Sequence, residues 1–453
     1  MEQRRRDERA DLLTPTSGAE SGRAIVIEPW LKRATTRGSA RAGAQTRSPE
    51  ARLAEAVGLA GAINLNVVQS GLVTLHQTRP ATYLGTGKVD EIAGLTKSLS
   101  ASVVIMDCAI SPVQQKNLEK AWNAKVIDRT GLILEIFGRR ARTREGALQV
   151  EHAHLTYQKT RLVRAWTHLE RQRGGFGFLG GPGESQLEMD RRLIEERIAR
   201  IEVELDKVKR TRKLHRDSRK RVPYPIVALV GYTNAGKSTL FNRMTAASVL
   251  SADMLFATLD PTLRAVDLPL GNRIILSDTV GFISDLPTML VAAFRATLEE
   301  VIEADIILHV RDMSHDDAGA QSHDVERVLG ELGIEATDRR LIEVWNKIDR
   351  LDAEGRARIL NFAERQTTEN PPIPVSALSG EGLDRLIPAI EARLDENRQT
   401  IQLSIDPADG AGMSWLYRHS EVLSKDLGED GRMAVTVRAD PDQAARVKAK
   451  FLS

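Results

Sequence analysis

The sequence predicts a multi-domain α/β protein. Its central domain would hold a mostly parallel sheet with helices on both faces. A small α/β domain and an antiparallel helical hairpin would precede it, and a small α/β module would follow it. Three observations predict this: a glycine-rich loop between an apolar run and a helix at 226–245, alternating strand-like and helix-like segments on both sides, and leucines repeating every seven residues before it.

We divide the 453 residues into five segments. Residues 1–51 are rich in Arg, Ala and Ser with little apolar periodicity, which predicts a disordered, basic and polar tail. The N-terminal α/β domain would cover 52–146 and the antiparallel coiled-coil hairpin 147–222, with a glycine-rich tip loop. The central domain would cover 223–397, and the C-terminal α/β module 398–453.

The composition excludes several classes of protein. The net charge of +2 leaves only local basic surfaces as candidates for binding polyanions. Cys108 is the single cysteine, which excludes a disulfide scaffold and cysteine-based zinc sites. No apolar run reaches the roughly 18 residues of a membrane span, and no secretory signal is present. We therefore expect a cytoplasmic protein without a membrane span.

The glycine-rich loop GYTNAGKS, Gly231 to Ser238, has the G-x-x-x-x-G-K-[ST] pattern. It follows the apolar run Ile226 to Val230 and precedes a helix that starts near Thr239. In this context the loop amides and the helix N-terminus bind phosphate. Lys237 would reach the outer phosphates, and the Ser238 hydroxyl would bind Mg²⁺. The loop therefore predicts a nucleotide site.

Three later motifs, each at a strand end, point to guanine nucleotides. Asp278 of DTVG would hold Mg²⁺, and the Gly281 amide would approach the γ-phosphate. Asp349 of NKID can accept from both the ring N–H and the amino group of guanine, which adenine does not offer. Ser376 begins SAL, whose backbone would complete the guanine pocket. Together the four motifs indicate a P-loop GTPase domain.

A GTPase also needs a mobile threonine between the loop and DTVG. Thr258 is our choice, and Thr262 is the competitor. Phe282 follows DTVG where many GTPases carry a glutamine that orients water, so we expect slow hydrolysis unless another group assists. That group could be a partner, another part of the chain, or K⁺ held near Asn234; a purely structural role of Asn234 is the alternative.

These considerations define the expected site. The catalytic residues are Lys237, Thr258 and Gly281, and the Mg²⁺ ligands are Ser238, Thr258 and Asp278. The GTP-binding residues are Gly231, Tyr232, Thr233, Asn234, Ala235, Gly236, Lys237, Ser238, Thr239, Phe256, Ala257, Thr258, Leu259, Asp278, Thr279, Val280, Gly281, Asn346, Lys347, Ile348, Asp349, Ser376, Ala377 and Leu378.

The segment before the central domain predicts two helices joined by a glycine-rich break. Leu148, Leu155, Leu162 and Leu169 recur every seven residues, and apolar residues from Ile194 to Val208 step by four and three. The tip, Arg173 to Ser185, carries aromatic rings and is flanked by arginines, a combination that can stack on bases and bind phosphates. Rings folded back on the hairpin, with solvated arginines, are the alternative. The candidate RNA-binding residues are Arg139, Arg140, Arg173, Gly174, Gly175, Phe176, Phe178, Arg191 and Arg192.

The chain resembles the HflX family of ribosome-associated GTPases. GYTNAGKSTLFN, LFATLDPT and DTVGFI carry the resemblance, together with RGGFGFLGGPGESQLEMDRR and GRRARTREGALQVEHAHL. It implies Mg²⁺-dependent GTP hydrolysis stimulated by the ribosome, binding to the large ribosomal subunit and its rRNA, and separation of the ribosomal subunits. The family's hairpin loop, here Gly174 to Gly183, would reach toward the peptidyl-transferase region.

The sequence therefore predicts a GTP-binding and GDP-binding factor that acts on ribosomes. We expect a monomer with Mg²⁺, and K⁺ as a second candidate cation. We expect it in the cytoplasm, partly ribosome-associated, or membrane-associated through partners only. Two alternatives stay open: a GTPase of large-subunit assembly, and a regulatory switch whose hairpin binds a protein.

Overall fold

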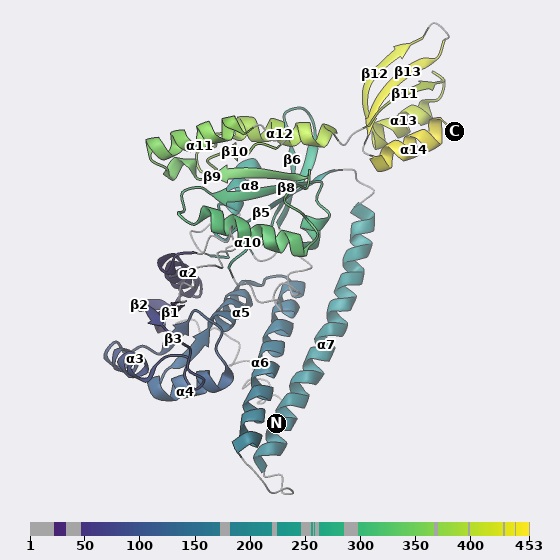
Figure 1. The fold of residues 1–453 in the computed structure, drawn as a ribbon. Coiled ribbons are helices and arrows are strands. Elements are labelled where there is room, and N and C mark those ends of the chain that lie inside the picture. Colours follow the sequence, from purple (N-terminus) through teal and green to yellow (C-terminus); the bar gives the residue numbers. More distant parts are fainter. Residues whose placement is uncertain are drawn as a thin grey trace, which may run out of the picture.

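Figure 1 shows the fold of the protein in a computed structural model. It describes residues 22–32, 47–172, 182–219, 224–245, 255–256, 258, 262–284, 298–366, 370–396, 399–428, 431–439 and 441–452. Along the chain these form an N-terminal α/β domain, a long helical hairpin, a central α/β domain and a small C-terminal module. This order is the predicted one.

The N-terminal domain is a four-stranded parallel sheet in the order β2-β1-β3-β4. Its elements are β1 (Arg23–Leu31), α2 (Pro49–Ala62), β2 (Asn66–Leu75), α3 (Thr86–Ser98), β3 (Val103–Met106), α4 (Pro112–Trp122), β4 (Lys125–Asp128) and α5 (Arg129–Arg140). Ser111 caps α4 through a capping box with Gln114, and Pro112 takes the first turn. The sheet has two apolar faces, which pack against different helices.

The prediction of a disordered tail over residues 1–51 is wrong for Arg23–Leu31. This segment is β1, which lies between β2 and β3 in the sheet and is buried from Ala24 to Glu28. A strand buried on both faces appears in sequence as a continuous apolar run, and AIVI is such a run. Helix α2 also starts inside the predicted tail, where the Ser48 side chain accepts a hydrogen bond from the Ala51 amide.

The hairpin consists of α6 (Arg144–Gln172) and α7 (Pro182–Arg219), which lie side by side and extend away from the central sheet (Figure 1). Leu148 and Ile201 are buried between them. The antiparallel register is marked by ion pairs such as Arg197–Glu151 at 2.8 Å. The predicted tip loop ends earlier than expected, because α7 already starts at Pro182; residues 173–181 lie outside the described part of the chain.

The central domain has a six-stranded sheet in the order β10-β9-β8-β5-β7-β6, parallel except for β6. Its elements are β5 (Ile226–Gly231), α8 (Lys237–Thr245), β6 (Thr262–Asp267), β7 (Arg273–Asp278), β8 (Ile306–Asp312), α10 (Ala318–Glu331), β9 (Leu341–Asn346), a 3-10 turn (Ile348–Arg350), α11 (Ala353–Arg365), β10 (Ile373–Pro374) and α12 (Leu383–Glu396). All four nucleotide motifs follow carboxyl ends of parallel strands, which places them at one edge of the sheet.

The C-terminal module is a three-stranded antiparallel sheet in the order β11-β13-β12 with two helices. Its elements are β11 (Gln399–Ile405), α13 (Gly410–His419), β12 (Glu421–Leu427), β13 (Met433–Ala439) and α14 (Pro441–Phe451). The strand β12 was not predicted, because most of its residues are exposed and polar.

One apolar core continues from the N-terminal domain into the central domain. Leu59 of α2 and Phe137 of α5 belong to the same buried cluster as Phe256, Phe282 and other residues of the central domain. The two domains therefore bury a common surface, and that surface lies on the side of the central sheet that carries the nucleotide motifs.

Candidate functional site

The phosphate loop joins β5 to α8 and has the backbone that its sequence requires. Asn234 and Gly236 both have positive φ, at 60° and 94°. A Cβ on Gly236 would lie 2.2 Å from Nδ2 of Asn346, so no larger residue fits there. Asn234 is exposed at the outer face of the loop, whereas Thr233 and Ala235 are buried. The loop is thus a fixed backbone frame with one exposed polar side chain.

Lys237 lies folded against this loop. Its Nζ donates to the Gly231 carbonyl at 3.1 Å and to the Tyr232 carbonyl at 2.9 Å. Burial lowers the pKa of Lys237 to about 8, against the opposing charge of Asp278. Phosphate oxygens beside the ammonium group would favour its charged form. The side chain therefore lies where it can pair with a phosphate.

The three predicted Mg²⁺ ligands lie together. Oδ2 of Asp278 accepts from the Ser238 hydroxyl at 2.7 Å and from the Thr258 hydroxyl at 2.9 Å. Oδ1 of the same carboxylate is buried without a hydrogen-bond partner among the described residues. One carboxylate with a free buried oxygen and two hydroxyls fit Mg²⁺, which binds few protein groups and completes its shell with phosphate and water. Thr262, the competing threonine, instead begins β6.

The DTVG segment approaches the phosphate loop through its backbone. The Thr233 amide donates to the Phe282 carbonyl at 2.7 Å, and the Phe282 amide donates to the Gly231 carbonyl at 3.1 Å. A Cβ on Gly281 would lie 2.8 Å from Cα of Thr233 and 3.0 Å from Nζ of Lys237. The Phe282 ring is buried in the shared core. A glycine is required at 281, and the next side chain faces away from the phosphates.

Asn346 connects the guanine-side motifs to the phosphate loop. It donates from Nδ2 to the Ala235 carbonyl at 2.8 Å and accepts at Oδ1 from the Ala377 amide at 2.9 Å. Lys347 pairs with Asp312 at 2.7 Å. Asp349 is exposed in the 3-10 turn, and Ser376 is buried. The motifs NKID and SAL are therefore parts of one structure.

The predicted GTP-binding residues differ in how exposed their side chains are. The ring of Phe256 packs edge-on against Phe137 with centroids 4.8 Å apart, so only its backbone could meet a nucleotide. Leu378 is 73% exposed. Thr239 is half-buried, while Thr279, Val280 and Ile348 are buried. Ala257 and Leu259 lie outside the described residues.

The predicted RNA-binding arginines fall into two groups. Arg139 and Arg140 donate to the carbonyls of Ile63 at 2.6 Å and Ala62 at 3.4 Å, so they also join α5 to the end of α2. Arg191 and Arg192 are exposed on α7, and among the described residues each pairs with a glutamate one turn away on the same helix. The remaining candidates, Arg173, Gly174, Gly175, Phe176 and Phe178, lie outside the described residues.

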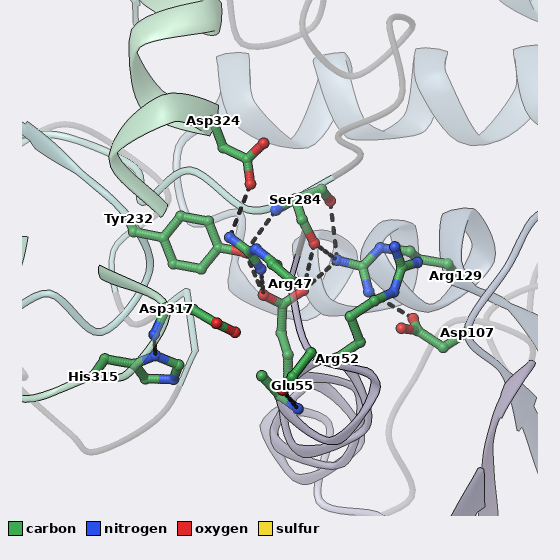
Figure 2. Close-up of polar contacts among 12 residues, drawn as sticks. Arg47, Arg52, Glu55, Asp107, Arg129, Tyr232, Ser284, His315, Asp317 and Asp324 are labelled. Atoms are coloured by element: carbon green, nitrogen blue, oxygen red, sulfur yellow. Dashed lines mark hydrogen bonds and ion pairs between the residues drawn. The ribbon is translucent and has the colours of Figure 1, made fainter. Parts of the chain in front are cut away.

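Sequence reasoning missed the residues by which the N-terminal domain meets the phosphate loop. A cavity of about 420 Å³ lies between them, lined by Glu55 and Gly58 of α2 and by Thr233 and Asn234 of the loop, among others. A group of polar side chains from both domains surrounds Tyr232 (Figure 2). No short motif marks these contacts, because the partners are far apart in the chain.

Four protein families match consecutive parts of the chain. They are GTP-binding GTPase N-terminal at residues 50–138, GTP-binding GTPase Middle Region at 140–219, 50S ribosome-binding GTPase at 226–347, and HflX C-terminal domain at 361–451. Within the described residues no helix is long and apolar enough to cross a membrane.

Characterised relatives match over most of their length. GTPase HflX from Magnetococcus marinus is 50% identical over 83% of this chain and 86% of the relative. GTPase HflX from Escherichia coli is 46% identical over 84% and 87%. A solved GTP-binding protein from Sulfolobus solfataricus in complex with GDP is 21% identical, with a TM-score of 0.44 over 82% of this chain and 99% of that one, which is too low to support an argument. The chain belongs to the HflX family of GTPases and is a GTP-hydrolysing enzyme.

Proposed function

We propose that this GTPase binds the large ribosomal subunit in its GTP form and promotes separation of the ribosomal subunits. The long hairpin is the observation that carries the proposal. Helix α7 has 38 residues, which at ~1.5 Å each span about 57 Å, and Arg191 and Arg192 stand exposed on it. The match of residues 226–347 to a family described as 50S ribosome-binding GTPase supports the same partner.

The nucleotide would be held by the residues that the four motifs supply. Lys237 pairs with the outer phosphates, the Gly281 amide donates to the γ-phosphate, and Asp349 selects guanine. Ser238, Thr258 and Asp278 would hold Mg²⁺, which neutralises charge that develops on the phosphates. Since the Phe282 ring is buried and cannot orient water, hydrolysis is slow until the ribosome, another part of the chain, or K⁺ near Asn234 assists.

The first test is GTP turnover with and without purified large subunits. We expect strong stimulation by the subunits in the wild-type protein and none in Lys237→Ala. Turnover that depends on Lys237 but ignores the subunits would contradict the ribosomal partner. A rate that is equal in Na⁺ and K⁺ would remove the cation from the mechanism.

The second test asks whether the hairpin acts on the ribosome. Deleting 174–183, or replacing Arg191 and Arg192 by Gln, should weaken subunit separation in sucrose gradients. Arg358→Gln with Arg418→Gln, two exposed arginines elsewhere, is the matched control. Binding of immature subunits only would favour the assembly GTPase. Binding that does not fall log-linearly with salt would favour a protein partner.

A further inference from the structure

The N-terminal domain contacts each element that senses the nucleotide. A Cβ on Gly58 of α2 would lie 3.1 Å from Cδ1 of Leu255, and Phe137 of α5 packs on Phe256, so this domain contacts the segment that leads to Thr258. Tyr232 of the phosphate loop and Ser284, three residues after Gly281, face the same domain (Figure 2). The Tyr232 and Ser284 contacts meet at one carboxylate, Glu55.

Glu55 accepts hydrogen bonds from both domains. Its Oε1 accepts from the Ser284 hydroxyl at 2.8 Å and from Nη2 of Arg129. Its Oε2 accepts from Nη1 of Arg47 at 2.7 Å and from the Tyr232 hydroxyl. The Tyr232 oxygen in turn accepts from the Ser284 amide at 2.7 Å. Tyr232 thus connects the phosphate loop, the segment after DTVG and the N-terminal domain.

The charges around Glu55 keep this arrangement in one protonation state. Burial opposes ionisation of Glu55, but the charges of Arg129 and Arg47 and the bond from Tyr232 outweigh it, so its pKa lies below the usual range. Burial and the Glu55 charge raise the pKa of Tyr232, which keeps its hydroxyl a donor. The carboxylate is only 9% exposed, so these bonds are little weakened by solvent.

The geometry links these bonds to the phosphate loop. Phe282 is bonded to the phosphate loop on both sides of Tyr232, through the Gly231 carbonyl and the Thr233 amide. Gly281 lies against Thr233 and Lys237 with no space for a Cβ. A movement of Gly281 relative to the loop must therefore change the distances among Ser284, Tyr232 and Glu55. In the same structure, the side chains of Ser238, Thr258 and Asp278 are hydrogen-bonded to one another at the expected Mg²⁺ site.

We propose that Glu55 is a positioning residue for GTP hydrolysis, acting through Tyr232 and Ser284. It holds the Gly281–Ser284 segment in the hydrolysis-ready position relative to the phosphate loop, and passes movements of that segment to the N-terminal domain. The proposal concerns hydrolysis itself and does not depend on the ribosomal partner.

The test compares Glu55→Gln, Tyr232→Phe and Ser284→Ala in the full chain. Since only positioning is lost, the intrinsic kcat should fall by about tenfold, while the Kd for GDP changes by less than about twofold. Tyr157→Phe is the matched control: it also removes a hydroxyl that donates to a buried carboxylate, that of Asp128, but this bond joins α6 to the N-terminal domain. Its kcat should stay at the wild-type value.

Hydrogen exchange measured with two nucleotides provides a second test, which a general change in protein stability would not affect. In the wild type, replacing GDP by a non-hydrolysable GTP analogue should change exchange in peptides containing Glu55 and Ser284. Tyr232→Phe should abolish the change at Glu55 and leave the Thr258 peptide responsive. A wild-type kcat in both Tyr232→Phe and Ser284→Ala would overturn the proposal, even if Glu55→Gln fails to fold. A rise in kcat would also overturn it. So would a fall in kcat that is proportional to the fall in melting temperature in all variants, Tyr157→Phe included.

Discussion

The phosphate site and the hairpin are stabilised in opposite ways. The side chains of Asp278 and Asn346 are held by hydrogen-bond partners on other strands or loops, and there is no space for an added methyl group at Gly281. The described ion pairs that join α6 to α7, such as Arg144–Glu204 and Arg197–Glu151, are largely exposed. GTP hydrolysis requires catalytic atoms at fixed positions. The hairpin needs only to remain straight over its length, and long helices do this without precise side-chain contacts.

The largest effect should come from Gly281→Ala. Its Cβ would meet Cα of Thr233 at 2.8 Å, so the backbone must move away from the phosphates. A displacement of this size at a reacting centre costs about a hundredfold in kcat. Gly330→Ala is the control, since a Cβ there has no atom within 4 Å. Single-turnover GTP hydrolysis measures both, and equal rates would show that the close approach is unimportant.

Asp278→Asn should weaken Mg²⁺ binding in the GTP complex. An amide offers one neutral oxygen in place of two charged ones, so the Mg²⁺ concentration for half-maximal hydrolysis should rise by about ten- to a hundredfold. Asp267→Asn, whose exposed carboxylate pairs with Arg273 on the neighbouring strand, is the matched control. If the Mg²⁺ titration of Asp278→Asn coincides with that of Asp267→Asn, Asp278 does not hold the metal.

Glu28→Gln should change how stability depends on pH. Burial, then the Asp107 charge, raise the pKa of Glu28 to about 8 from an ordinary value of 4.5. The native state therefore holds a proton that the unfolded chain releases, and the free energy of unfolding falls as pH rises from about 4.5 to about 8. The neutral amide should remove about 1–3 kcal/mol of this loss. Urea unfolding at pH 5 and pH 8 measures the free energy of unfolding at each pH. The same change between the two pH values in the wild type and in Glu28→Gln would contradict the prediction.

The smallest effect should come from the hairpin. Arg197→Gln breaks the pair with Glu151, whose side chains are 45% and 40% exposed, so it should cost less than about 1 kcal/mol of stability and leave GTP hydrolysis unchanged. Thermal unfolding compares it with Arg192→Gln, which loses only a pair within α7. A large loss of stability specific to Arg197→Gln would mean that the hairpin is held as tightly as the phosphate site.

What could be predicted from the sequence follows the same division. The phosphate site could, because each motif is contiguous and stands at a strand end. Asn346 was predicted to bind GTP, and in the structure it joins the phosphate loop to the SAL segment. The contact of Glu55 with Ser284 could not be predicted, because the two residues are 229 positions apart and belong to no motif. The strand β1 was missed since an Arg- and Ser-rich composition outweighed its short apolar run.

The parallel sheet of the N-terminal domain has a consequence for how the chain is made. All four of its strands lie between Arg23 and Asp128, so the sheet can close during synthesis before the phosphate loop leaves the translating machinery. Glu55 and Arg129 would then be exposed to solvent on the surface of the folded N-terminal domain. The central domain would then fold against a surface that is already formed. The interface residues of the N-terminal domain would therefore be in place before the nucleotide site forms.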